Sequence, residues 1–184
     1  VDKRKNKDAI RGHSPISLGK QMLLARRLCE SGCGFITVSS PGWDMHGAHE
    51  FAITDGMPVL GPAVDKAVSA FIEDIESRGL TEKVLLVITG EFGRTPKINA
   101  KGGRDHWGNL CPLVFVGGGL KMGQVIGESD KKGAEPITNP ITSNDLLGTI
   151  MHSLFDLGQV RTLANIPRDV QDVVGSGNPI SELI

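Results

Sequence analysis

The spacing of apolar residues predicts two amphipathic helices in the first half of the chain. Residues 17–32 place four apolar side chains on one helical face and close on a glycine, a residue suited to ending a helix. Residues 58–78 carry the same spacing over a longer stretch and are followed by another glycine, at position 79. The apolar face of the first predicted helix consists of Leu18, Met22, Ala25 and Leu28.

Four further segments carry the apolar runs of β-strands. Residues 83–90 and 112–119 are almost wholly apolar, which is typical of strands covered on both faces. Residues 34–40 are rich in β-branched and aromatic side chains and predict a short buried strand, while residues 123–129 predict a weaker strand at a sheet edge.

Residues 142–158 predict a third helix, because Ser143 and Asn144 suit its N-cap and an aspartate follows in its first turn.

This order of elements predicts an α/β fold with a layered, mainly parallel sheet flanked by helices. We expect residues 1–15 to form a basic tail and residues 16–184 to form a single α/β domain. The last 25 residues are rich in glycine, proline and asparagine, and we expect them to wrap the surface.

Composition narrows the class of protein. Twenty basic residues against 21 acidic ones leave a net charge of -1, which gives no electrostatic basis for binding nucleic acid or an anionic membrane. No apolar run approaches the roughly 20 residues that span a bilayer. Three cysteines do not make a disulfide framework, although a bond between Cys29 and Cys33 stays open.

Two polar loops follow predicted strands, and both carry residues that can bind a metal ion. In "WDMH", Asp44 and His46 lie two positions apart, so an extended backbone points both side chains to one side. In "GEFGRTP" and "GRDHW", Glu91 ends a buried strand and Asp105 precedes His106. Because the carboxyl ends of parallel strands form the ligand-binding edge of an open sheet, we expect both loops at one site.

These oxygen and nitrogen donors suit Zn, Mn or Mg. Structural alternatives exist for several of them. Glu91 could pair with Arg94 in the same loop, and Asp105 could hydrogen-bond to its neighbouring histidine without any metal. His49 is either an additional ligand or a solvated loop residue.

Arg94 and Arg104 add two guanidinium groups to the second loop. A planar guanidinium matches the oxygens of phosphate or sulfate, so the site is suited to neutralising a tetrahedral oxyanion. The alternative is that both arginines brace the loop through backbone carbonyls. No G-x-S-x-G motif occurs, so a serine hydrolase is not expected.

The motifs "GEFGRTP…GGRDHWG" and "GWDMHG", with the helix "ITSNDLLGTIMHSLF", resemble the bacterial domain-of-unknown-function 1501 family, which is related to the alkaline phosphatase and sulfatase superfamily. The resemblance covers residues 16 to 160. It implies an alkaline phosphatase-like fold and an exported or periplasmic protein. It also implies that Asp44, His46 and His106 bind a first metal ion, with Glu91 as a second-metal or outer ligand. Phe92 stands where the superfamily has a histidine, which weighs against a second metal.

The resemblance implies a metal-dependent hydrolase of phosphate or sulfate esters, acting on a small anionic ester. Arg94 and Arg104 would hold the oxyanion, and Asp105 would orient His106. Superfamily members carry their nucleophile upstream of these motifs, so we expect this chain to be the C-terminal portion of a larger domain, without the nucleophile and severely impaired alone. The alternatives are a non-catalytic binding module that kept the fold, and a purely structural loop held by salt bridges.

Overall fold

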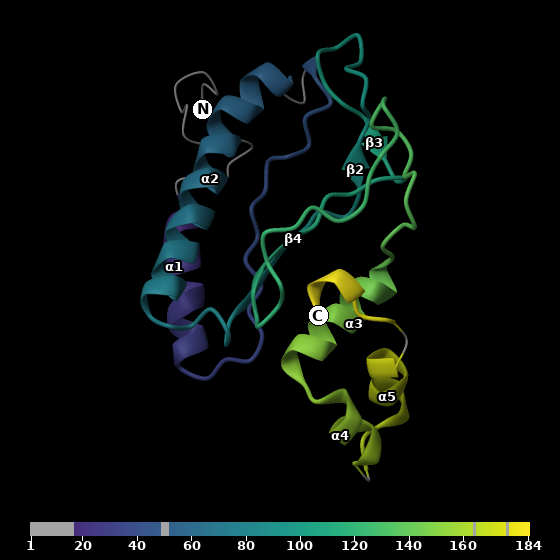
Figure 1. Cartoon of the computed structure of the whole chain (residues 1–184). Coiled ribbons are helices and arrows are strands. Elements are labelled where there is room, and N and C mark those ends of the chain that lie inside the picture. Colours follow the sequence, from purple (N-terminus) through teal and green to yellow (C-terminus); the bar gives the residue numbers. More distant parts are fainter. Residues whose placement is uncertain (1–16, 49–51, 164, 176) are drawn as a thin grey trace. The chain divides into compact units, whose positions relative to one another are not determined.

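The computed structural model describes residues 17–48, 52–163, 165–175 and 177–184, which form two compact units (Figure 1). The first unit extends to Gly79 and includes Phe92–Gly108; the second comprises Leu80–Glu91 and Asn109–Ile184. The basic tail expected at residues 1–15 lies outside the described residues, and the single domain expected for residues 16–184 stays a prediction. Among the described helices, none has the length and apolar character needed to cross a membrane.

Helix α1 (Ser17–Glu30) opens the first unit and confirms the prediction made from its apolar face. Leu18, Met22 and Ala25 are buried. The helix ends as its glycine predicts: Gly32 adopts a φ of 91°, and the N–H of Cys33 turns back to the carbonyl of Leu28 at 3.0 Å. This left-handed turn satisfies carbonyls that the last helical turn would otherwise leave without donors.

Helix α2 (Ile53–Ser77) lies beside α1 in the first unit (Figure 1). The predicted start at position 58 is wrong, because the helix begins five residues earlier and contains both Pro58 and Pro62. Sequence patterns favour proline at the first helical position, since its missing N–H costs nothing there. The extra turn is stabilised by tertiary packing, because Ile53 packs against the buried cluster of Met45 and Leu60.

The buried strand predicted at residues 34–40 is also wrong. This segment carries no strand, and the side chain of Phe35 is 78% exposed. None of the described strands pairs with it. The preference of β-branched and aromatic residues for strands depends on packing against a neighbouring strand, which this segment does not have in the described chain.

Two short strands complete the first unit. Strand β2 (Gly93–Arg94) pairs antiparallel with β3 (His106–Trp107), and the register sets Arg94 opposite His106. The pairing closes the polar loop that joins the two strands and fixes its two ends against each other.

In the second unit, β1 (Leu85–Ile88) pairs with β4 (Val114–Gly117). Both were predicted as strands, but the layered, mainly parallel sheet is a wrong prediction for the described residues, because this pair is antiparallel. A continuous apolar run indicates burial and carries no information on strand direction. The weak strand predicted at residues 123–129 is absent, apart from an isolated bridge between Ser129 and Pro136. The described chain therefore combines helices with two small antiparallel sheets.

Three helices and a 3-10 turn follow β4: α3 (Ser143–Leu154), α4 (Leu157–Thr162), α5 (Arg168–Gly175) and η2 (Ser181–Leu183). The helix predicted over residues 142–158 is confirmed in α3, but it stops at Leu154 and α4 begins anew with Asp156 as its N-cap. The C-terminal region is more regular than predicted, since it contains α5. Its end is packed, with Ile180 and Leu183 buried against Leu120.

Candidate metal centre

The first polar loop is anchored by Met45, which is 8% exposed and packs against Leu60. Met45 is buried, while the side chains of its two neighbours, Asp44 and His46, are 43% and 22% exposed. The two meet, with His46 Nε2 2.8 Å from Asp44 Oδ1. The convergence expected from their spacing is therefore present.

The second polar loop brings His106 to the same point. The Nε2 atom of His106 lies 3.0 Å from His46 Nε2 and 3.7 Å from Asp44 Oδ1. Backbone contacts hold the two loops together, because the N–H of Arg104 donates to the carbonyl of Met45 at 3.0 Å. Gly103 permits this approach: a Cβ there would lie 2.0 Å from the carbonyl carbon of His46.

The three ligand atoms form an irregular triangle close enough for one metal ion to reach all three. Asp44 Oδ1, His46 Nε2 and His106 Nε2 are separated by 2.8, 3.0 and 3.7 Å. The ligands of a tetrahedral zinc ion, at roughly 2.0–2.1 Å from the metal, lie about 3.3–3.4 Å apart, so small side-chain movements would bring these atoms to that geometry. A carboxylate and two imidazoles are also a donor set that zinc accepts. The residues present therefore fit a metal ion.

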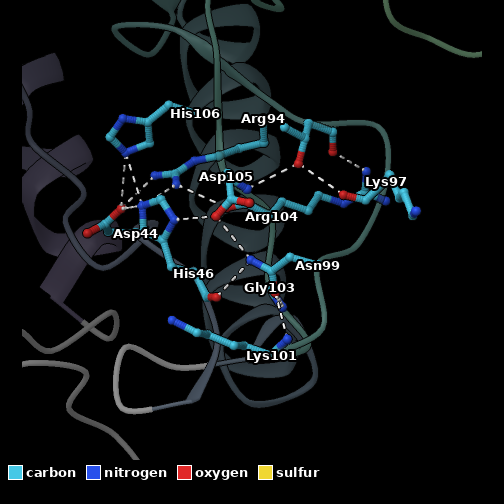
Figure 2. A network of polar contacts seen from close by, with 11 residues as sticks. Asp44, His46, Arg94, Lys97, Asn99, Lys101, Gly103, Arg104, Asp105 and His106 are labelled. Atoms are coloured by element: carbon cyan, nitrogen blue, oxygen red, sulfur yellow. Dashed lines mark hydrogen bonds and ion pairs between the residues drawn. The ribbon is translucent and has the colours of Figure 1, made fainter.

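Asp105 lies against His46, although we expected it to orient His106 (Figure 2). Its Oδ1 atom is 3.1 Å from His46 Nδ1. The hydrogen bond from His46, with a second one from Asn99, lowers the pKa of the Asp105 carboxyl below its ordinary value. A carboxylate only accepts, so a hydrogen on Nδ1 makes this bond, while Nε2 on the other side of the ring faces the Asp44 carboxylate at 2.8 Å.

Arg94 lies among the ligand atoms themselves (Figure 2). Its Nη2 donates to Asp44 Oδ1 at 3.0 Å, and its Nη1 lies 3.1 Å from His46 Nε2. Arg104 makes other contacts: its Nη1 donates to the backbone carbonyls of Thr95 and Pro96. The contacts of Arg104 are those of the loop-bracing alternative, whereas Arg94 places a positive charge at the cluster.

An open pocket of about 410 Å³ adjoins the cluster. Its lining residues all belong to the first unit: His46, Asn99, Ala100, Lys101 and Asp105. Asn99 and Lys101 were not among the residues selected from the sequence, since neither a lone asparagine nor a loop lysine forms a motif. Their place in the loop "PKINAKGG" between two site residues was the one indication available.

The family model described as "Protein of unknown function (DUF1501)" matches residues 2–184. The chain belongs to the DUF1501 family. No curated protein and no solved structure matches it. Any function for this DUF1501 protein therefore has to be argued from the geometry of its own residues.

Three other residues singled out from the sequence, Glu91, Phe92 and His49, do not belong to the triad. Glu91 is exposed and belongs to the second unit, and the cluster of potential metal ligands found among the described residues does not include it. The ring of Phe92 lies 4.2 Å from that of His106, between centroids, so it supports the histidine that faces Asp44. The possible ligand His49 lies outside the described residues.

Proposed function

We propose that this DUF1501 protein is a metal-dependent hydrolase of phosphate or sulfate esters, related to the alkaline phosphatase and sulfatase superfamily. The observation that carries the proposal is the convergence of Asp44 Oδ1, His46 Nε2 and His106 Nε2 within 4.8 Å of one another. Three protein ligands leave one position of a tetrahedral site open, which is typical of catalytic zinc. Mn or Mg are the alternatives for the same residues.

Each neighbouring group has a role in this proposal. A bound divalent cation would supply Lewis-acid stabilisation of charge on a tetrahedral oxyanion. Arg94, whose guanidinium already lies at the cluster, adds positive charge beside the same oxyanion. Asp105 orients His46 through its Nδ1 atom. The pocket beside His46, with Lys101 in its wall, receives the small anionic ester.

A non-catalytic binding module is the second candidate, and one observation favours it. Arg94 donates to Asp44 and approaches His46 Nε2, so a guanidinium already provides a positive charge where a metal ion would lie. Phe92 occupies the place of a second-metal histidine and packs on His106. This candidate predicts a protein that keeps the cluster intact without taking up a divalent cation.

Metal content distinguishes the two candidates. We expect the purified chain to bind about one Zn²⁺ or Mn²⁺ ion, measured by elemental mass spectrometry and calorimetric titration. His106→Ala should weaken binding at least about 100-fold, because even outer-shell partners of a metal site contribute 10- to 100-fold. The matched control is His152→Ala, which changes an exposed histidine in the last turn of α3 and should bind metal like the wild type.

Activity is then measured on the metal-loaded chain with p-nitrophenyl phosphate and p-nitrophenyl sulfate, and only slow hydrolysis is expected, because we expect the chain to be severely impaired alone. Hydrolysis that disappears in His106→Ala and persists in His152→Ala supports the hydrolase. If the wild type takes up no Zn²⁺, Mn²⁺ or Mg²⁺ at millimolar concentration, the hydrolase proposal fails and the binding module takes its place.

A further inference from the structure

The side chain of Asn99 makes four hydrogen bonds at the edge of the metal centre (Figure 2). Its Nδ2 donates to the carbonyl of His46 at 3.1 Å and to Asp105 Oδ1 at 3.0 Å. Its Oδ1 accepts from the backbone N–H of Lys101 at 2.9 Å and of Gly103 at 3.1 Å. An amide side chain has two donor hydrogens and two acceptor lone pairs, so every one of them is used.

This pattern fixes which way the amide points. Both partners of Nδ2 are pure acceptors, and both partners of Oδ1 are N–H donors. A flipped amide would face like groups on both sides and lose all four bonds. Asn99 therefore joins its own loop to the other polar loop through one rigid group.

The donor side of this amide acts on the metal centre through Asp105. The Asp105 Oδ1 atom lies between Asn99 Nδ2 and His46 Nδ1, at 3.0 and 3.1 Å. A second bond from the same Nδ2 holds the backbone of His46. The carboxylate and the imidazole are thus tied to one point, which holds the ring with Nδ1 against Asp105 and with Nε2 facing Asp44 and His106.

We propose that Asn99 is a positioning residue of the metal centre: it holds Asp105 against His46 Nδ1 and so sets the orientation in which His46 Nε2 faces the metal ion. The inference rests on the proposed function, since it explains how the protein prepares His46 as a ligand. Outer-shell partners of this kind contribute 10- to 100-fold to metal affinity.

Asn99→Asp separates positioning from loop bracing. The carboxylate of this variant keeps an oxygen that accepts from Lys101 and Gly103, but it offers no hydrogen to Asp105 or to the carbonyl of His46. The matched control is Asn109→Asp, which makes the same chemical change in the second unit, where Asn109 Nδ2 donates to Glu135.

Two measurements test the proposal. The side-chain ¹⁵N resonances of His46 in the metal-free protein report the hydrogen bond between Nδ1 and Asp105, and we expect the same Nδ1 resonance in the wild type and in Asn109→Asp. In Asn99→Asp we expect the Nδ1 resonance to shift as this bond weakens, and a 10- to 100-fold weaker affinity for Zn²⁺. A third variant, Asp105→Asn, should shift the Nδ1 resonance as well, and Asn99→Asp should add little to it, because Asn99 acts through Asp105.

The proposal is overturned if His46 keeps its wild-type ¹⁵N pattern in Asn99→Asp. It is also overturned if Asp105→Asn leaves that pattern unchanged, a result that decides the matter even if Asn99→Asp does not fold. Failure of the proposed function is a different result. If the wild type binds no Zn²⁺ but its His46 Nδ1 resonance still shifts in Asn99→Asp, Asn99 keeps its role in orienting His46 and the hydrolase is removed.

Discussion

Arg94 is the residue on which the chemistry of the cluster depends most directly. Its guanidinium bonds to Asp44 Oδ1 and approaches His46 Nε2, two of the three atoms that would bind a metal ion. A metal ion and the guanidinium therefore compete for the same lone pairs. For a metal ion to bind, Arg94 has to release these contacts; under the proposed function it would then be available to the oxyanion.

Removal of this competitor should strengthen metal binding. We expect Arg94→Ala to bind Zn²⁺ about tenfold more tightly than the wild type, since hydrogen bonds to charged groups are worth roughly 1.5–3 kcal/mol and a tenfold change needs about 1.4 kcal/mol. Competition with a chromogenic chelator measures the affinity. Arg104→Ala is the control, because Arg104 Nη1 donates to backbone carbonyls and not to the cluster. Weaker binding by Arg94→Ala would mean that the guanidinium supports the ligands.

At the scale of elements, the candidate metal centre is built on very little regular structure. Strands β2 and β3 contribute one residue each, Arg94 and His106, and the other residues lie on the loops around them. Met45 anchors one loop in the core beside α2, and Asn99 joins it to the other. The geometry of the site thus depends on a buried anchor and on hydrogen bonds between loops.

Helix α3 shows how a local sequence pattern creates a pH-dependent contribution to stability. Thr142 and Asp145 form a capping box, in which the Asp145 carboxylate accepts from the Thr142 hydroxyl at 2.7 Å and from its backbone N–H at 2.8 Å. The bond from the Thr142 side chain is the largest cause of the lowered pKa of Asp145. A carboxyl with a lowered pKa in the folded state favours folding when it is ionised.

The sign of this effect gives a prediction. The contribution of Asp145 is fully present above its unfolded pKa, about 3.9, and is lost as the pH falls through the lower folded value. Asp145→Asn should therefore be less stable than the wild type at pH 7, and the difference should shrink below about pH 4. Urea unfolding at several pH values measures it. In a Thr142→Ala background the pH dependence should flatten; if it does not, another group controls it.

At the scale of the whole molecule, Thr149 connects α3 to the C-terminal end of the second unit. Thr149 is fully buried at 0% exposure, and its hydroxyl accepts from the backbone N–H of Ile180 at 2.9 Å while donating to the carbonyl of Asp145 at 2.7 Å. Ile180 and Leu183 then pack on Leu120. One hydroxyl thus fixes the segment that closes this core.

Thr149→Val keeps the shape of the side chain and removes the acceptor, leaving the Ile180 N–H buried without a partner. We expect a loss of about 1–3 kcal/mol in the free energy of unfolding. Hydrogen exchange should also speed up at Ile180 and Leu183, measured by NMR or mass spectrometry. Thr149→Ser retains the hydroxyl and should keep the amide protected. Equal protection in both variants would show that apolar packing alone holds the segment.

The sequence alone predicted features that depend on near neighbours in the chain. The buried face and glycine end of α1 follow from helical periodicity. The side-by-side placement of Asp44 and His46 was expected from their two-residue spacing. In both cases the information lies within one stretch of residues. The DUF1501 family was indicated by motifs in several segments and is shown by the match over residues 2–184.

Only the tertiary structure decided which distant residues meet. It paired β1 antiparallel with β4, left residues 34–40 without a strand, and set Asp105 against His46 rather than His106. It also revealed Asn99, whose four partners lie on two separate loops. Strand direction and the partner of a carboxylate depend on contacts between segments far apart in sequence, and neither residue type nor periodicity specifies those contacts.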